Sequence, residues 1–110
     1  MKVDKKGHTT IIKDTQNDVA AFLEIVTSEH NAFKNQNLIL DVTHNKNITI
    51  AAVRPFLALS KLHRKGKKSF VLVAEDIDFN ALPAQLIVVP SLLEAHDIIE
   101  MEEIERDLGF

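Results

Sequence analysis

Imidazole is the side chain best suited to proton transfer and zinc binding near neutral pH, so the histidines are the first candidates for chemistry in this sequence. There are five of them, His8, His30, His44, His63 and His96, in a chain of 110 residues. No two lie close enough in the chain to form a local zinc motif such as His-x-His-x-Asp-His or His-Glu-x-x-His. The sequence therefore predicts no metal site.

Two of the histidines have a more specific setting. His30 belongs to an apolar stripe at helical spacing, which indicates a histidine at the edge of the core. His44 lies in the polar loop 43–47 directly after an apolar run, and such loops host ligands at the carboxyl ends of parallel strands. A surface residue is the simpler interpretation of His44, and ligand binding by its loop is the alternative.

Carboxylates are plentiful, and a pair of them could act as general acid and base. Glu75 lies near Asp76 and Asp78, and Glu102 precedes Glu103. A general acid needs partial burial to raise its pKa, and a solvated helix face does not provide that burial. We therefore interpret these groups as exposed surface. The absence of cysteine excludes thiolate chemistry, and no serine-hydrolase or phosphate-loop motif is present. We predict no catalytic residue, no cofactor and no enzymatic activity.

The net charge of −3 is unevenly distributed. A basic cluster consists of Lys61, His63, Arg64, Lys65, Lys67 and Lys68. From Glu75 to Asp107, ten acidic residues stand against one base, Arg106. Solvated surface is the simpler interpretation, and a two-signed surface that orients a partner is the alternative. The negative net charge and the lack of Tyr and Trp do not favour nucleic-acid binding by the basic cluster.

The apolar runs also bear on location. No apolar run follows the early lysines, so a secretory signal is not predicted, and every apolar stretch is far shorter than a membrane span. Absence of cysteine fits a reducing compartment. We expect a soluble cytoplasmic protein without a membrane partner.

The strands that must position these residues are short apolar runs. They are expected within 1–13, as one strand or two, and over 38–42, 69–73 and 86–89. Helical patterns separate them, and this alternation indicates a mainly parallel sheet with right-handed crossovers. The fold class is therefore α/β: one domain over 1–110, with a mainly parallel sheet of four to five strands and three to four helices packed against it.

The helices are predicted from apolar spacing and end signals. Asp14, Thr15 or Asn17 is expected to cap the first, which runs to Phe33. The second is expected from after Ile48 to about Lys65, with an irregular start at Pro55 and an inward face of Val53, Phe56, Leu57 and Leu62. A short helical turn is expected in 76–82. Ser91 with Glu94 forms a capping box for the last helix.

Three passages stand out together: LILDVT, VRPFLALSKLHRKGKKSFVLV and VVPSLLEAHDII. They resemble the STAS family, the domain of bacterial anti-sigma-factor antagonists, and the resemblance covers nearly the whole chain. It implies a STAS-like fold and a regulatory role in protein binding. Members of that family carry an Asp-Ser-Ser-Gly turn in which one serine is phosphorylated. Here that turn falls on Thr49, Ile50, Ala51 and Ala52, so the phospho-switch is expected to be lost or moved to Thr43 or Thr49, with Thr49 as the candidate.

The resemblance therefore implies a non-catalytic regulatory module whose partner is another protein: a regulatory kinase, a sigma regulator or an enzyme. The candidate partner-binding residues are Thr43, His44, Thr49, Ile50, Arg54, Lys61, Arg64 and Lys65. Charge reversal at Arg64 and Lys65 is expected to weaken binding and to leave thermal stability nearly unchanged.

Two alternatives complete the sequence-based hypotheses. The chain also resembles short chains that carry the name ribonuclease Z, but the ribonuclease Z enzymes use a metallo-β-lactamase fold with clustered His and Asp, which this sequence lacks. The alternative is therefore an accessory subunit associated with an RNA-processing enzyme of that type, without a metal site of its own. Self-association through the final segment EMEEIERDLGF, with Phe110 packed on the sheet or on a neighbouring molecule, is the second alternative.

Overall fold

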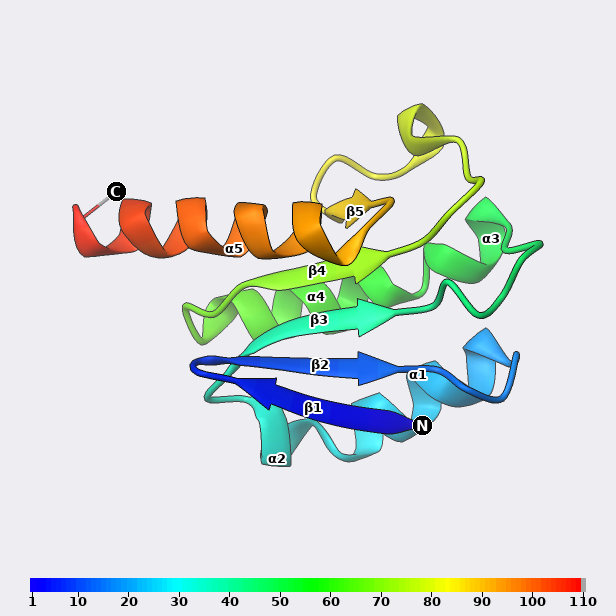
Figure 1. The fold of residues 1–110 in the computed structure, drawn as a ribbon, viewed down its shortest axis with the longest axis horizontal. Helices are drawn as coiled ribbons and strands as arrows, with labels where there is room; N and C mark the ends of the chain where they lie inside the picture. The colour runs from blue at the N-terminus through cyan, green and yellow to red at the C-terminus, as the bar shows by residue number, and fades with distance from the viewer. Residues whose placement is uncertain (110) are drawn as a thin grey trace.

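Five short strands pair into one sheet in the computed structural model, which describes residues 1–109 (Figure 1). The expected packing of Phe110 lies outside the described residues. The strands are β1 (Lys2–Lys6), β2 (Thr9–Lys13), β3 (Asn37–Asp41), β4 (Phe70–Val73) and β5 (Val88–Val89). Their order is β1-β2-β3-β4-β5; β1 is antiparallel to β2, and the other pairs are parallel. The predicted α/β class with a mainly parallel sheet is confirmed.

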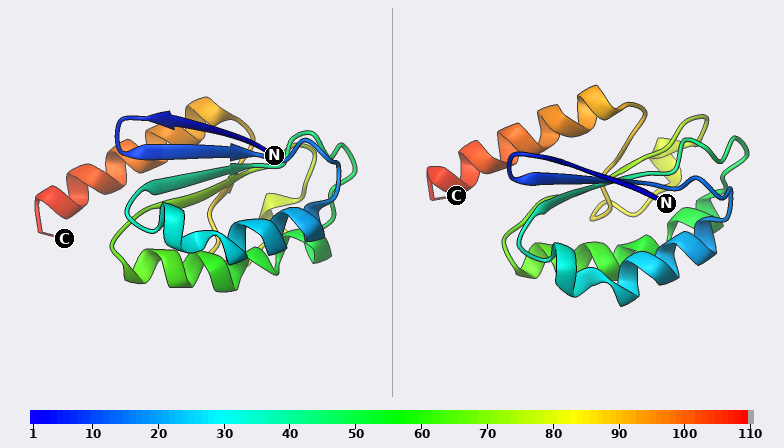
Figure 2. Two further views of the ribbon diagram at one scale, coloured as in Figure 1. Left: turned by 90° about the horizontal axis from the view of Figure 1, so that it is seen from below. Right: turned by 60° about the horizontal axis from the view of Figure 1, so that its bottom comes forward.

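Helices cover both faces of this sheet, as Figure 2 shows. The helices are α1 (Val19–Ser28), α2 (His30–Phe33), α3 (Ile50–Val53), α4 (Phe56–Lys65) and α5 (Leu92–Asp107), with a 3₁₀ turn η1 (Phe79–Ala81) before β5. Helices α1 to α4 lie on one face, and α5 lies alone on the other. The strand β1, at the edge of the sheet, is exposed along its whole length.

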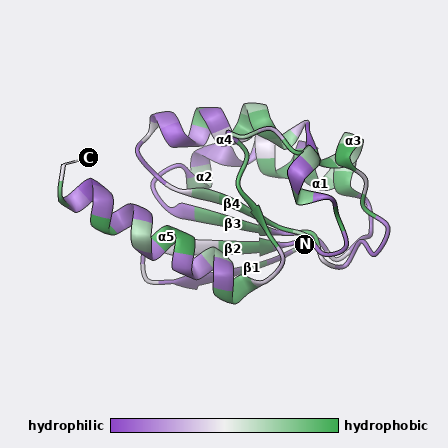
Figure 3. Cartoon of the chain, turned by 90° about the horizontal axis from the view of Figure 1, so that it is seen from above, coloured by the Kyte–Doolittle hydropathy of each residue, from purple (hydrophilic) through white to green (hydrophobic). Residues whose placement is uncertain are grey.

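The alternation of side chains along the strands divides the core into two layers. On the α1–α4 side, Ile12, Leu40 and Leu72 pack against residues such as Phe22 and Phe56. On the α5 side, residues including Ile39 and Val71 pack against Ala95 and Ile99. Hydrophilic and hydrophobic residues alternate along α5 (Figure 3), and its exposed residues include Leu93, Met101 and Ile104. Within residues 1–109, no helix combines the length and the apolar character needed to cross a membrane.

Both long helices expected from the sequence are interrupted, the first between α1 and α2 and the second between α3 and α4. The first begins after Asp18, whose Oδ1 accepts a hydrogen bond from the Ala21 amide at 3.1 Å, so the predicted caps Asp14, Thr15 and Asn17 are wrong. The second splits at Pro55 into α3 and α4, because proline has no amide hydrogen for the helical bond.

The inward face of α4 also differs from the expectation. Leu62 is 53% exposed, whereas His63 is 1% exposed. The spacing from Phe56 brings Leu59 and His63 onto the sheet side, and His63 is tolerated there because both ring nitrogens have hydrogen-bond partners. The last strand is also shorter than expected, since only Val88 and Val89 pair with β4.

Candidate binding surface at the carboxyl edge of the sheet

Two buried carboxylates mark the carboxyl ends of β2 and β3. Asp41 is the last residue of β3, and Asp14 directly follows β2, so the register Lys13–Asp41 brings them to the same edge. They are 4% and 2% exposed, respectively. Buried carboxylates need hydrogen-bond donors, and the loop after β3 supplies them to both.

Asp14 holds the middle of that loop. Its Oδ2 accepts from Asn45 Nδ2 at 2.9 Å, while its Oδ1 accepts from the Gln16 amide at 3.0 Å. Asn45 is itself 8% exposed and also donates to the Val42 carbonyl at 3.4 Å. The Asp14–Asn45 bond therefore connects the β2–α1 and β3–α3 loops.

Asp41 holds the start of the same loop. Its Oδ1 accepts from the Thr43 amide at 2.9 Å and from Thr43 Oγ1 at 2.7 Å. The end of the loop is fixed by Thr49, whose Oγ1 accepts from the Ala52 amide at 3.2 Å as the N-cap of α3.

The loop borders an open hollow of about 440 Å³. Its other wall is the start of α1. The lining residues that present polar side chains are Asn17, Asp18, His44, Asn45, Lys46, Asn47 and Thr49. His44, Lys46 and Asn47 are exposed, so amide, imidazole and ammonium groups face solvent above the buried hydrogen bonds. This surface is suited to hydrogen bonding with a partner.

The structure divides the predicted partner-binding residues into two groups. Thr43, His44, Thr49 and Ile50 belong to the carboxyl-edge loop or to the start of α3, and Arg54 follows α3. Lys61, Arg64 and Lys65 do not join them. Helix α4 returns the chain from the end of β3 to the start of the parallel strand β4, so its last residues lie at the amino edge of the sheet (Figure 1).

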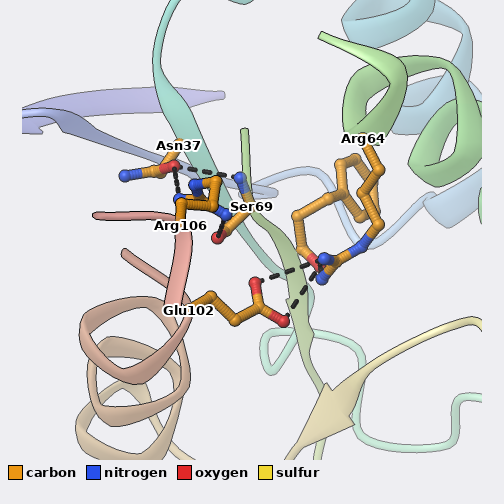
Figure 4. A network of polar contacts seen from close by, with 6 residues as sticks. Asn37, Arg64, Ser69, Glu102 and Arg106 are labelled. Atoms are coloured by element: carbon orange, nitrogen blue, oxygen red, sulfur yellow. Dashed lines mark hydrogen bonds and ion pairs between the residues drawn. The ribbon is translucent and has the colours of Figure 1, made fainter. Parts of the chain in front are cut away.

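Arg64 is moreover not a free surface cation. Its side chain is 29% exposed, lies 3.2 Å from Glu102 Oε1 as an ion pair, and donates from Nη2 to the Phe70 carbonyl at 2.9 Å (Figure 4). Reversing its charge would place a carboxylate beside Glu102 and the Phe70 carbonyl, so these contacts lead us to expect a loss of stability where the sequence alone predicted none. Glu102 likewise departs from the exposed acidic face that the sequence indicated, because its side chain is 19% exposed. Glu75, Asp76 and Asp78 are exposed, as predicted.

Two histidines form a pair that the sequence did not indicate. His30 Nε2 lies 2.8 Å from His63 Nδ1, and His63 Nε2 lies 2.7 Å from the Gln36 carbonyl. The prediction of His30 at the core edge is confirmed, since it is half-buried. Helical spacing from Phe56 was the signal for burial of His63, but the two histidines are 33 residues apart and no local pattern connects them.

The described residues contain no group of three or more His, Cys, Asp or Glu side chains that could hold a metal ion. Comparisons of the sequence with protein-family models and with curated proteins find no match. The function is therefore inferred from the sequence and geometry of the chain itself.

Proposed function

We propose that this chain is a non-catalytic regulatory protein-binding module of STAS-like type that acts in the bacterial cytoplasm. It resembles an anti-sigma-factor antagonist, and its partner is a regulatory kinase, a sigma regulator or an enzyme. The carboxyl-edge surface, which we define as Asn17, Asp18, Thr43, His44, Lys46, Asn47, Thr49 and Ile50, is the proposed contact.

The observation that carries this proposal is the contrast within one loop. Thr43 and Asn45 are tied to buried carboxylates, whereas His44, Lys46 and Asn47 between and beyond them are exposed. A polar loop that is ordered before binding loses less conformational entropy in a complex, which favours affinity. Exposed side chains on a fixed loop are also the usual means by which a rigid scaffold recognises a partner.

Thr49 is the proposed phosphorylation site of the module. It is exposed, and its hydroxyl caps α3 at the border of the hollow. A phosphate there would add about −1.5 to −2 charges to a surface that carries one lysine, Lys46. Phosphorylation is therefore expected to change the choice of partner rather than the fold.

The test is affinity purification of the tagged protein from its native cells at low salt, with partners and phosphosites identified by mass spectrometry. The edge variant His44→Glu/Asn47→Lys alters two exposed loop residues without changing the net charge. The matched control Glu24→Lys/Lys5→Glu alters two exposed residues that are not candidates for partner binding, again without changing the net charge.

We expect wild type and control to recover the same partner in stoichiometric amount, and the edge variant to recover at least about tenfold less. Equal recovery by the edge variant would assign binding to another surface. Recovery of no partner by the wild type would count against the module as proposed.

A further inference from the structure

A second hollow, of about 400 Å³, lies at the opposite, amino edge of the sheet. It is lined by Arg64, Lys67, Lys68, Arg106 and Gly109. The cations come from three places in the chain: the last turn of α4, the turn between α4 and β4, and the last turn of α5. The fold thus gathers four positive charges onto one cavity, from α4 and α5 on opposite faces of the sheet and from the turn that follows α4.

Among the described residues, one of these four charges is paired with an acid. Arg64 forms an ion pair with Glu102 at 3.2 Å. Arg106 instead contacts two neutral oxygens, Ser69 Oγ at 3.1 Å and Asn37 Oδ1 at 3.3 Å. Within residues 1–109, neither Lys67 nor Lys68 forms an ion pair. The lining therefore has a marked excess of positive charge.

The two guanidinium groups are held in place by buried acceptors. Asn37 and Ser69, which orient Arg106, are both 0% exposed, and Figure 4 shows them at the starts of adjacent strands. A guanidinium has five N–H donors, so these two bonds leave three for a ligand.

Arg64 is fixed by the edge of β4. Strand β5 pairs only with Leu72 and Val73, which leaves the Phe70 carbonyl without a strand partner on that side. Arg64 donates to this carbonyl at 2.9 Å. Groups of the sheet thus fix the positions of both arginine side chains that line the hollow.

The backbone at Lys67 adds an independent observation. Lys67 has a φ of 61°, in the left-handed region that favours glycine, while the preceding Gly66 has a φ of −80°, which any residue adopts. A Cβ atom at Gly66 would make only ordinary contacts, the nearest at 3.4 Å from the His63 carbonyl oxygen. The turn therefore keeps a lysine, in a strained conformation, at a position that lines the hollow.

We infer that this hollow binds the phosphate group of a small phosphorylated molecule. Arginine forks and lysine ammonium groups together match the oxygens and double negative charge of a phosphate. The cavity has room for such a group and part of the molecule attached to it. A long polyanion fits less well, because α5 carries Glu103, Glu105 and Asp107 beside Arg106.

The experiment is a titration of the ¹⁵N-labelled full chain followed by NMR at about pH 8, where phosphate is mainly the dianion. The probes are inorganic phosphate, a nucleoside monophosphate and a single-stranded RNA, each against sodium chloride at equal ionic strength. Saturable shifts of the Lys67, Lys68, Ser69 and Gly109 amides with either small phosphate support the site. Shifts that match those in sodium chloride, or that occur with RNA alone, overturn it.

Variants distinguish a specific phosphate-binding site from general charge attraction. Lys67→Gly removes one cation and relieves the backbone strain, so it should fold well, and Lys68→Gln removes a second. Each is expected to weaken phosphate binding roughly three- to tenfold. Lys61→Gln removes the same charge from the exposed side of α4, outside the hollow, and should leave affinity unchanged. Equal affinity in all three variants would overturn the assignment.

Discussion

His30 donates a hydrogen bond from Nε2 to Nδ1 of His63 across 2.8 Å, and this bond fixes the protonation of both rings. The Gln36 carbonyl can only accept, so the proton of His63 is on Nε2, which leaves Nδ1 as the acceptor for His30. A proton added to Nδ1 of His63 would remove that acceptor. The bond would then persist only if His30 moved its own proton from Nε2 to Nδ1.

This pair predicts a loss of stability in mild acid. Burial lowers the pKa of His63 from 6.5 to about 4; the bond to Gln36 opposes the shift, and His30, Arg64 and Lys68 add to it. Burial, with Lys34, lowers the pKa of His30 in the same direction. Between pH 6.5 and 4 the unfolded chain therefore binds more protons than the folded one. Stability is full above pH 6.5 and falls as the pH approaches 4, by about 3 kcal/mol at most from His63.

Urea unfolding of wild type and His63→Gln across this pH range measures the effect. The variant should be less stable at pH 7 but should show a shallower fall with acid. His44→Gln, at an exposed position, should keep the slope of the wild type. A slope that His63→Gln does not change would contradict the assignment to His63.

Asn45 is expected to be the most sensitive residue of the carboxyl-edge loop. Asn45→Ala removes the donor to the buried Asp14 carboxylate and should lower the free energy of unfolding by about 1 to 3 kcal/mol. Because the loop then loses its middle anchor, partner binding should weaken as well. Asn47→Ala, at an exposed position of the same loop, should leave stability within about 0.5 kcal/mol. Denaturant unfolding checks both, and equal values for the two variants would refute the role of the Asp14–Asn45 bond.

Thr49 is predicted to matter to stability through its hydroxyl. Thr49→Ala should destabilise by about 1 kcal/mol, because the Ala52 amide loses its acceptor, whereas Thr49→Ser should be nearly neutral. Thr15→Ala, at an exposed threonine outside any helix, serves as the control in thermal denaturation. A Thr49→Ala melting temperature equal to that of the control would show that the cap is not needed.

The order of Gly66 and Lys67 predicts that the turn can be stabilised. Lys67→Gly should raise the free energy of unfolding by about 0.5 to 1 kcal/mol, because it relieves a positive φ of 61°. Gly66→Ala should add a similar amount, since its φ of −80° suits alanine and the added Cβ makes only ordinary contacts. Calorimetry of the single and double variants tests this. Destabilisation by Lys67→Gly would mean that the lysine side chain contributes more to the fold than its backbone strain removes.

The element order followed from the sequence because apolar periodicity and end signals are local. The strand 38–42, the cap at Thr49 and the cap at Ser91, whose hydroxyl accepts from the Glu94 amide at 3.2 Å, all depend on residues a few positions apart. Hydrophobicity alone misassigned Leu62 and His63. A buried histidine is acceptable only when its partners are present, and those come from the distant segment that holds His30 and Gln36.

The candidate site was only partly predictable for the same reason. Loop position after a strand singled out Thr43, His44 and Thr49, which do lie near one another. The anchors Asp14 and Asn45 are 31 residues apart, and their pairing follows from the parallel register of β2 and β3, which a pattern in one segment does not reveal. Basic residues were grouped by sequence proximity, so Arg106 was left out of the cluster that it joins in space.

The strictly sequential order of the strands has a consequence for synthesis of the chain on the ribosome. Each strand pairs with the one made just before it, so the sheet can grow in the direction of translation without waiting for a distant segment. One face of the sheet does wait for a later segment: the face containing Ile39, Val71 and Val73 is covered only by α5. Until that helix has emerged, the nascent sheet presents an open apolar face. Arg106, bonded to Asn37 and Ser69, then joins the last helix to strands that formed much earlier.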